Sequence, residues 1–134
     1  MKRKITIIAA LLALVFICAA AIEPMQKVVE FKNLQILPKD ISEKALQRIM
    51  EDEFNKALGV TCDYCHIKIA DAADLDYTSD MKGEKQIARS MMRMTMEINQ
   101  KYFNREQPMI GDSLMTIKCM TCHQGNPYPP EPKH

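Results

Sequence analysis

Two short segments of the sequence carry the residue types that attach a haem group covalently. Cys62-Asp63-Tyr64-Cys65-His66 and Cys119-Met120-Thr121-Cys122-His123 share the pattern Cys-x-x-Cys-His. In this pattern the two thiols form thioether bonds to a porphyrin, and the histidine binds the iron. The sequence therefore predicts two covalently bound haem c groups, with thioethers at Cys62, Cys65, Cys119 and Cys122 and proximal iron ligands at His66 and His123.

Paired cysteines also occur in zinc sites and in thiol–disulfide redox proteins, and two observations favour haem over these alternatives. The chain has only three histidines, and two of them directly follow a cysteine pair. Cys119 follows Cys62 by 57 positions, whereas the two pairs of a four-cysteine zinc site are usually about 15–20 residues apart. A zinc site or a reactive dithiol is therefore the weaker interpretation.

The N-terminal residues are typical of an export signal. Three basic residues at positions 2–4 precede an uncharged apolar run over residues 5–22, and alanines at 19–21 offer a cleavage site. We expect residues 1–21 to be a signal peptide, which places the mature protein in the periplasm. Two alternatives stay open: the run could remain as an anchor at the outer face of the inner membrane, or a lipid could be attached to Cys18.

Residues 22–134 suffice for one small dihaem domain whose core is largely porphyrin. Cleavage would remove three of the 18 basic residues and none of the 17 acidic ones, leaving a net charge near −2. Such a balance does not suit nucleic acid, which attracts basic proteins. The prolines at positions 127, 129, 130 and 132 predict an extended tail over residues 125–134.

Residues 40–58 predict a first helix that leads into the first haem motif. Asp40 or Ser42 can cap its start, and Gly59 supplies the left-handed position that commonly ends a helix. Apolar residues recur along it at helical spacing: Ile41, Ala45, Leu46, Ile49, Met50, Phe54 and Ala57.

Residues 82–102 predict a second, longer helix, with Ser79 or Asp80 as its cap. Its apolar stripe consists of Ile87, Met91, Met94, Ile98 and Tyr102. We expect residues 66–81 to be a solvated linker and residues 109–117 to form a small hairpin. The predicted fold class is therefore mainly α: two units, each a methionine-bearing helix followed by Cys-x-x-Cys-His, with little or no β-sheet.

Histidine is too scarce to supply the second axial ligand of both irons. Only His134 remains outside the motifs, at a chain end where residues are usually mobile. Methionine is the other common ligand of low-spin haem. Met50 lies on the apolar face of the helix before the first motif and is the candidate there. For the second haem, periodicity favours Met91 and Met94 about equally.

Longer strings around these residues resemble the cytochrome c subunit family of photosynthetic reaction centres. The resemblance covers residues 29–132 and is carried by Leu58-Gly59-Val60, Ala88-Arg89, Met91-x-x-Met94-Thr95-x-x-Ile98-Asn99, and Cys119-x-Thr121-Cys122-His123-x-Gly125 with Pro127, Pro129 and Pro130. In that family a methionine on the helix before such a motif binds the iron. The resemblance therefore implies Met50 as the distal ligand of the first haem and Met91 for the second, with Met94 as the alternative.

The chain departs from the family pattern in its haem number. The family subunit has four haems, one of them with two histidine ligands, whereas this chain has two motifs and no histidine between His66 and His123. The resemblance is thus to a two-haem half of the subunit.

These features predict an electron carrier rather than an enzyme. We expect it to exchange single electrons with redox partner proteins and to have neither a small-molecule substrate nor nucleic acid as a partner. One alternative is a subunit of a membrane-bound respiratory or photosynthetic complex. Another, a dihaem peroxidase or sensor with one open iron site, fits the small size less well.

Overall fold

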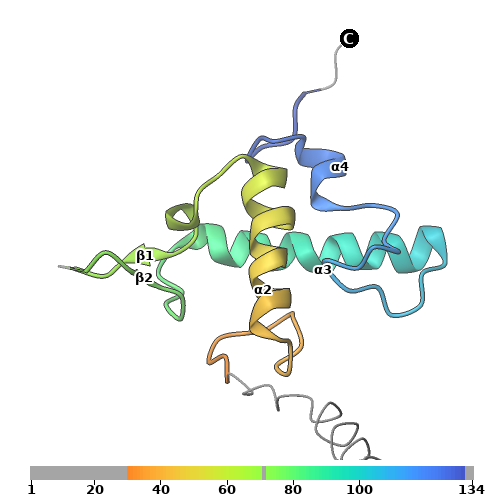
Figure 1. Cartoon of the computed structure of the whole chain (residues 1–134). Helices are drawn as coiled ribbons and strands as arrows, with labels where there is room; N and C mark the ends of the chain where they lie inside the picture. Colours follow the sequence, from red (N-terminus) through yellow and green to blue (C-terminus); the bar gives the residue numbers. More distant parts are fainter. Residues whose placement is uncertain (1–29, 71, 132–134) are drawn as a thin grey trace, which may run out of the picture.

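The computed structural model describes residues 30–70 and 72–131, and these form a mainly helical domain with one very small sheet. The predicted fold class is thereby confirmed. In chain order the elements are α2 (Glu43–Ile49), the π-helix η1 (Met50–Lys56), the 3-10 helix η2 (Cys62–Tyr64), β1 (Ile67–Lys68), β2 (Leu75–Asp76), α3 (Gly83–Phe103) and α4 (Cys119–His123). The two long helical pieces cross at a steep angle, with α4 beside the upper end of the first (Figure 1).

The first helix is continuous from α2 through η1 to residue 58, close to the predicted 40–58. It begins after Ser42, whose hydroxyl oxygen accepts a hydrogen bond from the backbone N–H of Ala45 at 3.2 Å. Of the two predicted caps, Ser42 is thus confirmed and Asp40 is wrong, and the helix begins three residues after position 40. Gly59 ends the helix with φ +67°, as predicted.

The π-helical turns of η1 were not predicted from the sequence. In a π-helix each backbone N–H bonds the carbonyl oxygen five residues earlier rather than four, and η1 covers Met50–Lys56. Such wider turns are rare and frequently occur at functional sites. Here they begin at Met50, the candidate iron ligand.

Helix α3 runs one residue later at each end than predicted, and its N-cap residue Lys82 makes no side-chain capping bond. The caps predicted at Ser79 and Asp80 are therefore wrong, because the Asp80 carboxylate instead accepts two hydrogen bonds from Arg89. The face of α3 packed against the rest of the protein is also not the predicted stripe. The buried residues are Arg89, Met92, Thr95 and Asn99.

The core lies where α3 passes the first helix. Ile49 of α2 and Met92 of α3 belong to one cluster of buried side chains, completed by Leu37, Ile110 and Met115 from the connecting segments. Half-buried residues packed against this cluster include Met50 and Phe54. The core thus fixes the crossing of the two helices and with it the place of Met50.

The described part of segment 66–81 is largely exposed, as predicted, but it is more ordered than a plain linker. It contains the antiparallel pair β1–β2, in which Ile67 lies opposite Asp76. The Asp76 carboxylate accepts hydrogen bonds from the backbone N–H groups of Thr78 and Ser79, which shapes the turn after β2. Conversely, no strand lies in the segment 109–117, where a hairpin was predicted. It consists of turns, one of them closed by Asp112 N–H to Met109 O at 3.0 Å.

Several sequence predictions fall outside the described residues. These are the signal peptide 1–21, the alternatives at Cys18, and His134. Residues 125–131 form neither helix nor strand. None of the helices within the described ranges is long and apolar enough to cross a membrane.

Candidate haem sites

The first attachment motif opens onto a cavity of about 320 Å³. Met50 from η1 lines it together with Cys62, Cys65 and His66, so the four residues predicted for the first haem share one space. Much of the remaining wall is apolar and comes from segments far apart in the chain: Phe31, Leu34, Ile36, Leu37, Leu46, Phe54, Val60, Ala88 and Met92. An apolar cavity with thiol, imidazole and thioether groups suits a porphyrin.

The His66 ring is about half-buried in this cavity wall. Its Nδ1 atom is the one buried side-chain nitrogen or oxygen in the described residues without a hydrogen-bond partner. The ring meets the Tyr77 ring edge to face, with centroids 4.9 Å apart. Burial, and then the positive charges of Lys85 and Lys82, lower the pKa of His66. The imidazole is thereby kept neutral, which is the form that binds a metal.

A polar network lies beside the apolar wall. Arg89 is only 6% exposed, and its guanidinium forms a bidentate pair with Asp80 at 3.0 and 2.9 Å. Asn33 and Gln35 donate to the same carboxylate at 2.8 and 3.3 Å. The hydrogen bonds from Arg89, and after them the one from Asn33, lower the pKa of Asp80 to about 2. The network ties α3 to the chain before α2 and to the turn after β2, both of which line the cavity.

The second motif forms α4, whose histidine is already oriented. His123 Nδ1 lies 2.9 Å from the carbonyl oxygen of Asn126. Because a carbonyl only accepts, Nδ1 carries the proton, and Nε2 is left free to bind a metal. Burial, followed by the negative charge of Glu53, raises the pKa of the Cys119 thiol to about 12. Burial also raises the pKa of Cys65.

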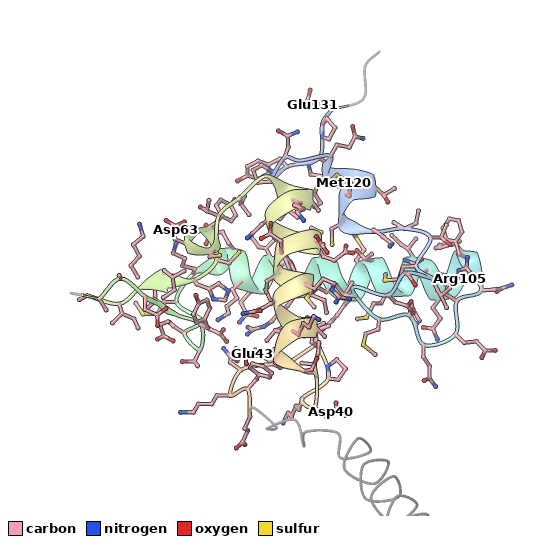
Figure 2. The ribbon with its side chains drawn as sticks, in the orientation of Figure 1. Asp40, Glu43, Asp63, Arg105, Met120 and Glu131 are labelled. Carbon is pink, nitrogen blue, oxygen red and sulfur yellow. The ribbon has the colours of Figure 1, made fainter. Side chains whose placement is uncertain are left out.

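The raised pKa values of Cys65 and Cys119 do not favour thiol–disulfide exchange at these two thiols. Thiol–disulfide exchange needs a thiolate, which a raised pKa disfavours. Among the described residues, no group of three or more His, Cys, Asp and Glu side chains could hold a metal ion between them. The two motifs nevertheless lie near the same end of the first helix, where Asp63 and Met120 mark them in Figure 2.

The structure does not enclose the candidate ligands of the second haem. Met91 and Met94 are 41% and 45% exposed on the outer face of α3. Ile87 and Tyr102 of the predicted apolar stripe are exposed as well. The methionine of α3 that is buried is Met92, which belongs to the core and lines the first cavity. Burial therefore does not decide between Met91 and Met94.

Two features near the sites had only weak sequence signals. Asn99 is fully buried and its side chain hydrogen-bonds residues 116 and 117, just before the second motif. The sequence signal available for Asn99 was its spacing of four residues from Thr95, which places both residues on one face of the helix. Asp80 and Arg89, in contrast, are nine residues apart and lie in different elements, so no periodicity connects them.

Residues 12–132 match the photosynthetic reaction centre cytochrome C subunit family, which is most of the chain. The chain belongs to this family. Members of the reaction-centre cytochrome c family bind c-type haems and carry electrons on the periplasmic side of the membrane. The resemblance inferred from the motif strings is thereby confirmed.

Curated members of the reaction-centre cytochrome family are similar over part of their length. The photosynthetic reaction center cytochrome c subunit of Rubrivivax gelatinosus is 30% identical over 70 residues, covering 52% of this chain and 16% of that protein. The subunit of the same name from Roseobacter denitrificans is 31% identical over 107 residues, covering 71% of this chain and 27% of that protein. The chain thus spans about a quarter or less of the length of these relatives.

Proposed function

We propose that this chain is a periplasmic dihaem cytochrome c that transfers single electrons and catalyses no reaction of its own. The observation that carries the proposal is the shared cavity of Met50, Cys62, Cys65 and His66. Family membership supports electron transfer in general, and the second Cys-x-x-Cys-His motif supports a second haem.

At the first site the residues of the chain have distinct roles. Cys62 and Cys65 would form the thioether bonds, and His66 and Met50 would be the two iron ligands. The apolar wall excludes water, which keeps the dielectric low and limits reorganisation during electron exchange. When bound, haem supplies the one-electron ferric/ferrous couple. A thioether ligand favours the ferrous form relative to imidazole, so a fairly high midpoint potential is expected.

At the second site, Cys119 and Cys122 would hold the porphyrin and His123 would bind the iron through Nε2. Met91 is the proposed distal ligand, with Met94 as the alternative. Both lie on the exposed apolar face of α3, which also includes Ile87 and Tyr102. A contiguous row of exposed apolar side chains is unfavourable in water. A second porphyrin over this face would cover it, which supports haem binding there.

Mass spectrometry of the denatured, natively expressed protein tests the proposal. Two covalent haem additions are expected, together with cleavage after Ala21. Replacing Cys62 and Cys65 by alanine should remove one haem, and replacing Cys119 and Cys122 should remove the other. A wild-type protein without two covalent haems, a double-cysteine variant that keeps both haems, or a protein with zinc in place of haem would contradict the proposal. The same spectrum reports an uncleaved N-terminus or a lipid on Cys18.

A second candidate function is that of a subunit in a membrane-bound electron-transfer complex. The family description favours it, because the named relatives are subunits of photosynthetic reaction centres. Purification from mildly solubilised membranes distinguishes the two. A free carrier is expected in the periplasmic fraction, and a subunit in a large complex with its partners.

A further inference from the structure

The side chain of Asn99 joins α3 to the segment that leads into the second haem motif. Its Oδ1 accepts hydrogen bonds from the backbone N–H groups of Thr116 and Ile117 at 2.7 and 3.0 Å. Its Nδ2 donates to the carbonyl oxygens of Ile117 and Thr95 at 2.7 and 2.9 Å. A side-chain amide can accept two hydrogen bonds and donate two, so this one is completely satisfied. Asn99 is also fully buried, at 0% exposure.

The connection continues along α3 to the candidate iron ligand. The Thr95 hydroxyl donates to the carbonyl oxygen of Met91 at 2.8 Å, and Thr95 is 8% exposed. A buried series of hydrogen bonds therefore runs from Met91 through Thr95 and Asn99 to Ile117. Ile117 stands two residues before Cys119. The series joins the two parts of the second site, which are separated in sequence by the connection 104–118.

Among the hydrogen bonds found in the described residues, those of Asn99 are the ones that join α3 to residues 116–118. Apolar contacts would hold the two segments together but would tolerate sliding, because dispersion has little directionality. Three of the four hydrogen bonds of the Asn99 amide cross to residues 116 and 117, and together they fix both distance and direction. Losing them would leave buried backbone groups without partners.

We propose that Asn99 and Thr95 are positioning residues for the second haem. They hold the turn of α3 that carries Met91 in a fixed place relative to the Cys119–His123 motif, so that the thioether of Met91 and the imidazole of His123 would be available to the same haem. The inference rests on the proposed function and deepens it. Neither side chain would touch the iron, because both hydrogen-bond backbone groups and act on the ligands through the backbone.

The test uses Asn99→Asp in the natively matured protein, with Gln100→Glu as the matched control. Both changes turn an amide into a carboxylate on neighbouring residues of α3, but Gln100 is exposed. In Asn99→Asp the new oxygen faces the carbonyls of Thr95 and Ile117, where no donor remains. We expect both variants to keep two covalent haems. Asn99→Asp should lower the midpoint potential of one haem. It should also weaken the far-red absorption band that arises from the bond between methionine sulfur and haem iron, because one of the two haems would lose that bond. Gln100→Glu should change neither the potentials nor the band.

Thr95→Val and Thr95→Ser keep the proposal testable if Asn99→Asp does not fold. Valine removes the hydroxyl with little change in shape, and serine retains it. Thr95→Val is expected to shift the same single midpoint as Asn99→Asp, and Thr95→Ser to restore the wild-type value. A melting temperature that falls in Thr95→Val while both midpoints stay unchanged would show a merely structural role and overturn the proposal.

The haem count and absorption spectrum of the wild-type protein distinguish a failure of the proposed function from a failure of the positioning role alone. A wild-type protein without two covalent haems, or without the sulfur-to-iron band, refutes the proposed function and this inference with it. A wild-type protein with both, accompanied by Asn99→Asp and Thr95→Val variants whose two midpoints are unaltered, refutes this inference alone. Equal shifts of both midpoints also refute it, because they would indicate general loosening of the fold.

Discussion

Gly59 and Gly125 meet backbone to backbone. A Cβ atom on Gly59 would overlap the carbonyl oxygen of Gly125, and the N–H of Gly125 donates to the carbonyl oxygen of Ala57 at 2.9 Å. Gly59 lies three residues before Cys62, and Gly125 lies two residues after His123. The two attachment motifs are therefore joined directly, at the end of the first helix, rather than through the core.

Replacing Gly59 by alanine should destabilise the domain and disturb the relative placement of the two motifs. The left-handed backbone, with φ +67°, alone costs an L-residue about 1–2 kcal/mol. The overlap with Gly125 adds to this because backbone, not a flexible side chain, would have to move. Chemical denaturation measures the loss in the free energy of unfolding.

Two glycines serve as controls for this change. Gly125 also has a left-handed φ of +81°, but a Cβ there would meet no atom within 4 Å, so Gly125→Ala should show the backbone cost alone. Gly83 has neither feature, and Gly83→Ala should be neutral or slightly stabilising. A Gly59→Ala variant no less stable than Gly125→Ala would contradict the close approach.

Replacing Met50 by histidine should lower the midpoint potential of one haem and leave the other unchanged. Imidazole favours ferric iron more than a thioether does. The expected fall is on the order of a tenth of a volt or more, within the ~0.8 V range that axial ligands cover. A redox titration followed by absorbance resolves the two steps. Met81→His is the control, since Met81 is 84% exposed and lies outside the cavity, and unchanged potentials in Met50→His would reject Met50 as a ligand.

Alanine substitutions at Met91 and Met94 decide which of them binds the second iron. Both are similarly exposed, so a difference between the variants reports ligation rather than packing. We expect Met91→Ala to remove one haem's share of the sulfur-to-iron band and to open that iron to cyanide or carbon monoxide. Met94→Ala should retain the band and the closed site. The opposite pattern would transfer the role to Met94, and no loss in either variant would exclude both.

Acid should weaken the domain in a pH range set by Asp80. The hydrogen-bonded Arg89 guanidinium stabilises the ionised Asp80 carboxylate and lowers its pKa from 3.8 to about 2. The unfolded chain therefore takes up a proton at higher pH than the folded one. The contribution of the pair is complete above about pH 4 and is lost as the pH falls towards 2.

Asp80→Asn should remove this part of the acid dependence and lower stability at neutral pH, because Arg89 is left buried without its counter-ion. Melting temperatures from pH 2 to 7 measure both effects. Asp52→Asn is the control. Its 2.8 Å pair with Lys56 is exposed on both sides, and exposed pairs contribute little. Parallel pH profiles for the wild type and Asp80→Asn would refute the assignment.

The chemistry of haem attachment could be inferred from the sequence because it depends on consecutive residues. Cys62, Cys65 and His66 are close to each other in any fold, and the same holds for the motif at 119–123. The helix ends were also nearly predictable, since caps such as Ser42 and the left-handed Gly59 act on their own neighbours.

Tertiary structure decided which face of α3 is buried. On hydropathy alone, the face of α3 with Met91 and Met94 is the one expected to pack in the core. The chain instead buries the face with Arg89, Thr95 and Asn99. Burying such polar groups is favourable only when partners satisfy them. Thr95 finds its partner in its own helix, at the carbonyl oxygen of Met91, but the partners of Arg89 and Asn99 lie at Asp80 and at residues 116–117. No local pattern places those partners there.

The first cavity is likewise a tertiary feature, built from residues 31–37, the first helix, the first motif and α3. A helical methionine is equally suited to core packing and to iron binding, so sequence position alone leaves the role of Met50 undetermined. Its place in the cavity that Cys62, Cys65 and His66 also line depends on the crossing of the two helices. That crossing results from the packing of side chains distant in the chain, chiefly Ile49 and Met92.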